Sequence, residues 1–181
     1  PIFILLGIEH VKINEGISAV TPFDFTYYPF THSLFSVIVW AVLFGGIYFL
    51  IKKKFKSALI LGVLVLSHWF LDLLVHIPDL PIFPGGDLKV GFGLWNSFTA
   101  TVLLEGFIFA AGVFLYYKAT KTKNKTGTYA LVGLIVFLAV MYAANLFGPP
   151  PDNVDAIGIV GNAQWLIVAW GYWIDRNREA S

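Results

Sequence analysis

Five long stretches of the chain are almost entirely apolar, and more polar segments separate them. Each is 19 to 21 residues long, close to the roughly 20 residues that a helix needs to cross a bilayer. Strands that cross a membrane are about ten residues long and alternate apolar with polar positions, whereas these stretches are continuous. We therefore predict an all-α bundle with five complete membrane spans, at about residues 33–51, 57–77, 97–117, 128–147 and 156–174.

A shorter apolar segment, residues 1–8, opens the chain. As a helix it would extend only about 12 Å, which is less than half the hydrocarbon thickness of about 30 Å. It lacks the basic first region and the small-residue cleavage site of a signal peptide. We interpret it as the end of a sixth span that begins before Pro1, and a short interfacial segment is the alternative.

The composition agrees with a membrane protein and excludes several kinds of site. Hydrophobic residues make up 57% and charged residues 13%, whereas soluble domains average about 25% charged residues. The chain has no cysteine, which excludes disulfide scaffolds, zinc–thiolate sites, iron–sulfur clusters and thiol nucleophiles. The net charge is +1 without a basic stripe, so we expect no nucleic-acid partner. We expect one transmembrane domain over residues 1–181.

Basic residues are concentrated in alternate connections between the spans. Ten of the 12 lysines and arginines lie in residues 52–56, 118–125 and 176–178, and only Lys12 and Lys89 lie elsewhere. Because cytoplasmic connections carry an excess of lysine and arginine, we expect the C-terminus to be cytoplasmic.

The opposite connections are then the outer loops. They are rich in proline and aromatic residues, and proline fixes φ, which indicates shaped loops rather than flexible linkers. These loops are residues 10–31, 78–96 and 148–155.

The second span carries three ionisable residues, which are costly in a bilayer and usually mark a site. His68, Asp72 and His76 are spaced at i, i+4 and i+8, and each step of four residues rotates by about 40° around a helix. An imidazole and a carboxylate four residues apart can bind one metal ion. His68 and His76 would be about 12 Å apart along the helix axis, too far for both to bind it. Buried hydrogen bonds between helices are the alternative.

Two further polar residues could belong to the same site. His32 begins the first span near the outer face and could join the stripe, although a histidine at a helix start can also be a capping or interfacial residue. Glu105, on the third span, could be a metal ligand, a general base or a protonated carboxyl that bonds to a neighbouring helix. The sequence has no nucleophile elbow, P-loop or dinucleotide fingerprint. Glycines in the spans, such as Gly45 and Gly46, indicate close helix packing.

Two motifs together resemble a known family. Residues 29–34 (PFTHSL) and 67–72 (SHWFLD) resemble the bacterial inner-membrane proteins called membrane-bound metal-dependent hydrolases, which include the LexA-binding, inner-membrane-associated hydrolases. That family has a Thr-His-Ser-like motif at a helix start and a later His-x-x-x-Asp motif within a helix. A closer subgroup is matched by Asp24, residues 68–81 and residues 91–96.

The resemblance covers roughly residues 1–117. Family members also carry a Gly-His-Tyr/Phe-like motif and a helix with an aspartate, both upstream of the point where this chain starts. The resemblance therefore implies an N-terminally truncated member, and we expect roughly 20 or more further residues before Pro1, the length of a span, with a histidine and an aspartate among them.

The resemblance also implies hydrolysis that depends on a divalent metal ion, at a site in the outer half of a bacterial inner-membrane bundle. Histidine ligands favour zinc, and manganese or iron also accept His and Asp. We expect the substrate to be an ester or phosphoester of a phospholipid or another lipid-like molecule. The expected metal ligands are His32, His68 and Asp72; His76 and Asp79 would support them or belong to a second ion, and Glu105 is a candidate base.

Two other functions use the same residues. In a transporter or channel, the polar stripe would line an ion or proton path. In a non-catalytic subunit of a membrane assembly, it would only hold helices together. The oligomeric state is open.

Overall fold

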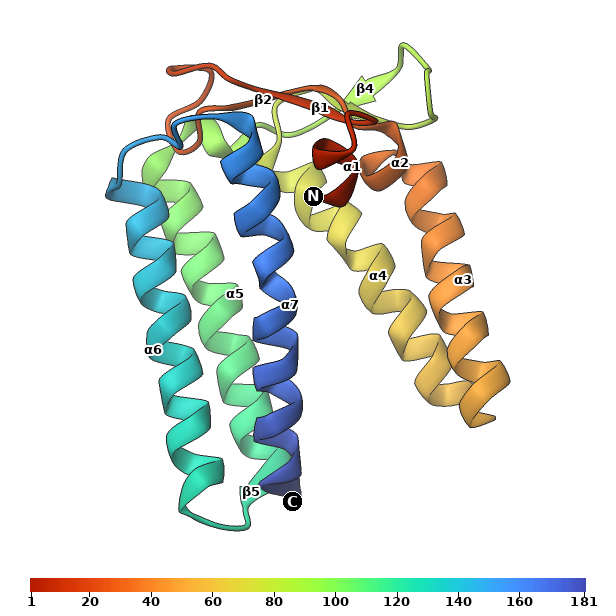
Figure 1. Ribbon diagram of the computed structural model, residues 1–181, viewed down its shortest axis with the longest axis vertical. Helices are drawn as coiled ribbons and strands as arrows, with labels where there is room; N and C mark the ends of the chain where they lie inside the picture. Colours follow the sequence, from red (N-terminus) through yellow and green to blue (C-terminus); the bar gives the residue numbers. More distant parts are fainter. The chain divides into compact units, whose positions relative to one another are not determined.

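The computed structural model describes residues 1–181 and is mostly helical (Figure 1). By length and composition, five of its helices could cross a membrane, which confirms the five predicted spans. Each helix begins and ends within three residues of the range expected from hydropathy. They are α3 (Leu34–Lys52), α4 (Phe55–Val75), α5 (Phe98–Ala119), α6 (Lys125–Phe147) and α7 (Val154–Arg176).

Two short helices, α1 and α2, precede these spans. α1 (Ile2–Leu5) has only four residues, so the sixth span stays a prediction. α2 (Pro29–His32) also has four residues and begins with a proline, which is favourable in the first turn because its missing N–H is not needed there.

The all-α prediction is incomplete, because the connections contain three small antiparallel sheets. The strands have two to five residues each, too few for alternation to be recognised in the sequence. The pairs are β1 (His10–Ile13) with β2 (Phe23–Tyr27), β3 (Leu80–Pro81) with β4 (Lys89–Val90), and β5 (Thr120–Thr122) with β6 (Arg178–Ala180).

The chain divides into two compact units, residues 6–101 and residues 1–5 with 102–181. The first, here called the α3–α4 unit, contains α2, α3, α4 and the β1–β2 and β3–β4 hairpins. The second, here called the α5–α7 unit, contains α1, most of α5, α6, α7 and the β5–β6 sheet. The single domain expected over residues 1–181 stays a prediction.

Small residues allow α3 and α4 to pack closely as an antiparallel pair (Figure 1). A Cβ atom at Gly45 would lie 2.9 Å from the carbonyl oxygen of Ala58, and one at Gly62 would lie 3.2 Å from that of Ala41. Helices in membranes commonly use such small residues to bring their backbones together. The close approach brings residues of α4 near the start of α3, where His32 lies.

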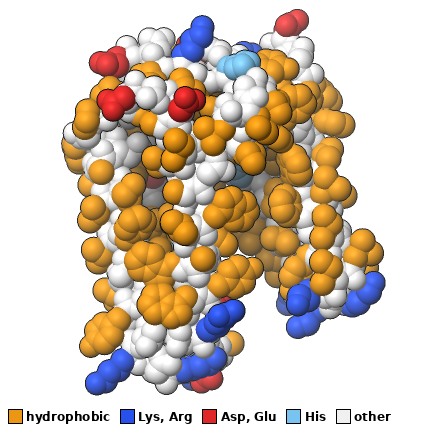
Figure 2. Space-filling model, viewed as in Figure 1, with side chains coloured by type: hydrophobic (Ala, Val, Ile, Leu, Met, Phe, Trp, Pro, Cys, Tyr) orange, Lys and Arg blue, Asp and Glu red, His pale blue; other side chains and the backbone are white.

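The α3–α4 unit has a small buried core beneath its hairpins. The buried cluster consists of Tyr28, Val37, Trp69 and Leu80, so it joins the segment before α2, both long helices and β3. Outside this core, the long helices expose apolar side chains along their length (Figure 2), as a helix that faces lipid does. The core therefore fixes one end of the helix pair, which is the end that carries the polar residues.

Candidate metal centre

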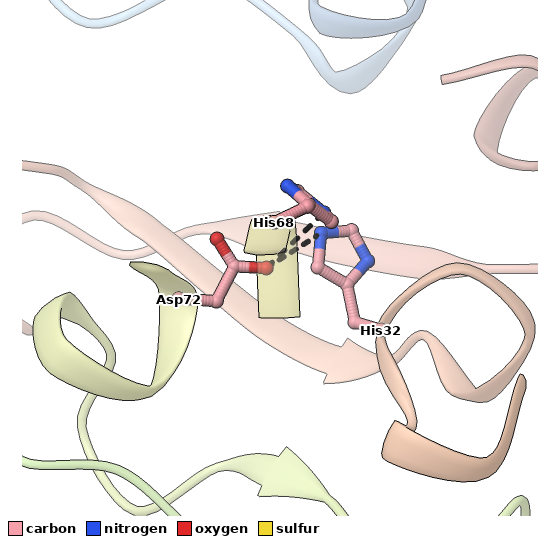
Figure 3. Close-up of side chains that lie close together, drawn as sticks. All are labelled: His32, His68 and Asp72. Carbon is pink, nitrogen blue, oxygen red and sulfur yellow. Dashed lines mark ion pairs between the residues drawn. The ribbon is translucent and has the colours of Figure 1, made fainter. Parts of the chain in front are cut away.

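Three of the predicted site residues converge in the α3–α4 unit (Figure 3). Nε2 of His68 lies 3.2 Å from Oδ2 of Asp72, and Nε2 of His32 lies 3.8 Å from the same oxygen. One ligand atom from each of the three residues lies within 4.8 Å of the other two. In a tetrahedral zinc site with bonds of about 2.1 Å, ligand atoms are about 3.4 Å apart. The two separations from Asp72 lie on either side of that value, so the donor set fits a metal ion.

Local structure explains how each residue reaches the cluster. His68 and Asp72 are one turn apart on α4, so their side chains share a face of the helix. His32 ends α2, and the backbone is extended at Ser33, with ψ at 142°. Ser33 then starts α3 by accepting a hydrogen bond from the Ser36 N–H at 3.2 Å, a favoured role for serine. The break between α2 and α3 thus places His32 beside α4.

The carboxylate of Asp72 is the central group of the cluster. Its side chain is 14% exposed, and Oδ2 is buried without a hydrogen-bond partner. Buried polar atoms in native proteins are nearly always satisfied. A cation between this oxygen and the two imidazole nitrogens would satisfy it.

A buried hydrogen-bond network, here called the Glu9 relay, contacts His32 at Nδ1, the ring nitrogen that does not face Asp72. Glu9 is 3% exposed, and its Oε1 accepts the N–H groups of Phe30 and Thr31 at 2.9 and 2.8 Å. The Thr31 hydroxyl donates to Glu9 Oε2 at 2.7 Å and lies 2.6 Å from His32 Nδ1. The relay therefore joins Glu9, Thr31 and His32 in sequence.

The Glu9 relay determines which nitrogen of His32 carries its proton. A threonine hydroxyl has one hydrogen and two lone pairs, and in the relay Thr31 donates that hydrogen to Glu9. The hydroxyl oxygen must then accept from Nδ1–H of His32. Nε2 consequently keeps its lone pair, and this is the nitrogen that faces Asp72. Metal-binding histidines are commonly oriented in this way by a hydrogen bond at the other ring nitrogen.

Burial also favours the neutral form of His32. Burial, together with the neighbouring His68 and His76, lowers the pKa of the His32 imidazole to about 3. A neutral imidazole is the form that binds metal ions.

His76 lies one residue past the end of α4, whereas the sequence predicted it within the second span. α4 ends at Val75, and His76 is its C-cap with an extended backbone, at φ −65° and ψ 145°. Pro78 explains the ending, because a proline disfavours the helical conformation in the residue before it. His76 is 2% exposed, and its Nδ1 lies 3.0 Å from Oδ1 of Asp79. The buried His76 and the partly buried Asp79 form a pair outside the group of three ligand atoms.

The loop after β4 packs against the end of α4. The N–H of Gly93 donates to the carbonyl oxygen of His76 at 2.7 Å, and that of Phe92 donates to Leu73 at 2.8 Å. A Cβ atom at Gly91 would lie 2.5 Å from the His76 oxygen, so only glycine fits there. The ring of Trp95 lies 4.6 Å from that of His76, measured between centroids. These contacts give a structural reason for residues 91–96 to occur together with residues 68–81 in the subgroup that the chain resembles.

Comparison with known proteins now identifies the family. The family model for the YdjM inner membrane protein matches residues 26–148, which is more than half of the chain. The chain belongs to the YdjM inner membrane protein family. No curated protein matches it, and no solved structure matches it. Family membership and the apolar helices together support a location in the bacterial inner membrane.

The region matched to YdjM contains all three residues of the cluster, whereas Glu9 precedes it. Sequence reasoning missed Glu9 and Thr31 as site residues. Thr31 could have been noticed, because it adjoins His32 in the PFTHSL motif. Glu9 gave no signal, because 22 residues separate it from Thr31 and only the folded chain brings them together.

Glu105 lies in the other unit of this YdjM family member. It is half-buried on α5, and the nearby Tyr142 hydroxyl of α6 has no hydrogen-bond partner. Its role as a carboxyl that bonds to a neighbouring helix stays a prediction. Its role as a general base stays a prediction.

Proposed function

We propose that this protein is a metal-dependent hydrolase of the bacterial inner membrane. The observation that supports this most directly is the cluster of two imidazole nitrogens and one buried carboxylate oxygen at separations of 3.2 and 3.8 Å. A divalent ion held there would lower the pKa of bound water to about 7 and stabilise negative charge in a hydrolytic transition state. The resemblance to membrane-bound metal-dependent hydrolases points to the same chemistry.

Each residue of the centre then has a distinct task. His32, His68 and Asp72 hold the ion, and zinc is favoured over manganese or iron because two ligands are imidazoles. The Glu9 relay keeps Nε2 of His32 free of a proton. His76 and Asp79 form a pair beside the cluster, where they help to fix the end of α4.

The position of the cluster suggests where substrate is bound. The cluster lies at the end of α4 away from the basic residues 52–56, so we place it on the outer side, with a cytoplasmic C-terminus. The side chain of His68 is 53% exposed, which leaves one side of the cluster accessible. An ester or phosphoester of a lipid-like molecule at the outer interface suits this position.

The experiment is a hydrolysis assay on purified protein in mixed micelles with phospholipid and with a soluble phosphodiester. Activity should disappear with a chelator, return with zinc or manganese, and be absent in Asp72→Asn. The matched control is His10→Ala, because His10 lies on β1 outside the cluster and its loss should leave activity unchanged. Metal-independent activity, or ion flux through sealed vesicles without any hydrolysis, would favour another function.

A further inference from the structure

The α5–α7 unit has a long groove with a volume of about 880 Å³. It lies between α5 and α6, and the β5 strand and Arg178 lie at one end of it. The walls are mostly apolar, with side chains such as Phe109, Val113, Leu131 and Ile135. Along α5, the lining extends from Phe109 to Lys118, which is about 14 Å of helix. That length is about half the hydrocarbon thickness of about 30 Å, so the groove matches the depth of one leaflet.

Three cations line the sheet end of this groove, namely Lys118, Lys121 and Arg178. Arg178 is only 5% exposed, and its guanidinium donates to Thr120 Oγ1 at 2.9 Å, Thr120 O at 3.0 Å and Gly127 O at 3.4 Å. All three acceptors are neutral. Arg178 forms no ion pair, because every ion pair in the structure involves a histidine, whereas Lys121 lies opposite Glu179 in the β5–β6 sheet. Buried charges are normally paired, and an anion at this end of the groove would compensate them.

We propose that this groove binds an anionic phospholipid. The phosphate would lie against Lys118, Lys121 and Arg178, and an acyl chain would extend along the apolar wall toward Phe109. The combination of a basic end and an apolar wall distinguishes a lipid from a free anion, which would need only the basic end. Basic pockets between spans on the cytoplasmic side are known to bind lipid headgroups in this way, and the basic end is the end that we expect to face the cytoplasm.

The test titrates purified protein in neutral detergent with phosphatidylglycerol and, separately, with phosphatidylcholine of the same chains, and counts bound lipid by native mass spectrometry. Wild type should prefer phosphatidylglycerol. The double variant Lys118→Gln/Lys121→Gln should lose about 25-fold in that affinity, because each lysine near the membrane surface contributes about fivefold. The matched control is Lys53→Gln/Lys56→Gln, which removes two lysines of the α3–α4 unit and should bind like wild type.

A second variant tests the apolar wall. Ala110→Phe keeps every charge and fills part of the groove, so it should weaken phosphatidylglycerol binding while the melting temperature stays near that of wild type. Equal affinity of wild type for the two lipids would overturn the proposal. Equal losses of phosphatidylglycerol affinity in Lys118→Gln/Lys121→Gln and in the control Lys53→Gln/Lys56→Gln would also overturn it. Unchanged binding in Ala110→Phe together with displacement by inorganic phosphate would also overturn it, because the site would then recognise a free anion only.

Discussion

Replacing Thr31 with valine removes the middle of the Glu9 relay and keeps the shape of the side chain. Both residues are β-branched and similar in shape, so the backbone of α2 should be preserved. Two short contacts are lost, at 2.7 Å to Glu9 and 2.6 Å to His32. Nδ1 of His32 then has no acceptor, and the neutral ring can carry its proton on Nε2 instead, where it faces Asp72 and opposes metal binding.

The size of the effect follows from comparable sites. Removing a group that bonds to a metal-binding histidine typically lowers metal affinity 10- to 100-fold. We expect a loss in that range for Thr31→Val, equivalent to about 1.4 to 2.7 kcal/mol. Glu9→Gln should act in the same direction, because an amide can donate to Thr31 and reverse the direction of the relay.

The assay is a zinc competition titration against a chelator of known affinity, at fixed pH and in detergent. Thr26→Val is the matched control, because Thr26 Oγ1 donates only to the exposed backbone oxygen of His10 at 3.2 Å. The control should bind zinc like wild type. Zinc affinity within twofold of wild type in both Thr31→Val and Glu9→Gln, with normal melting, would refute the role of the relay.

Three further predictions concern topology, the His76 pair and the loop that packs on it. The chain has no cysteine, so introduced single cysteines can report topology in intact cells. Cysteines at Asn14, Gly86 and Asn153 should react with an impermeant thiol reagent, and cysteines at Lys54 and Lys123 should be protected. Reversed labelling would contradict the orientation. His76→Ala should weaken metal binding by less than the 10- to 100-fold typical of a group bonded to a ligand, because His76 only packs against the His32 ring, at 6.3 Å between centroids; complete loss in a metal titration would instead make His76 a ligand. Gly91→Ala should destabilise the protein by about 2 kcal/mol or more, because its Cβ would overlap the carbonyl oxygens of His76 and Ile77; an unchanged melting temperature would show that the loop moves freely.

Features that depend on local sequence could be predicted well. The five spans follow from continuous apolar stretches, and the helices confirm them. The spacing of His68 and Asp72 on one face follows from helix geometry, and the structure brings them together with His32.

Features that depend on contacts between distant segments could not be predicted. The β1–β2 hairpin pairs residues on either side of the loop 14–22, and the position of Glu9 depends on that hairpin. The apolar stretch continues to Ile77 and predicts His76 within the second span, yet the helix stops at Val75. Hydropathy records the apolar character of Ile77 but not the backbone restriction that Pro78 imposes on it.

The central claim is that His32, His68 and Asp72 hold a metal ion. The direct measurement is metal per protein by elemental analysis, on wild type and on His68→Ala and Asp72→Ala, after incubation with zinc or manganese and removal of free ions. The account predicts one bound ion per chain in wild type and a collapse of occupancy in both variants. Wild-type protein without stoichiometric metal, or variants that retain it in full, would contradict the account and leave these residues a purely structural role in helix packing.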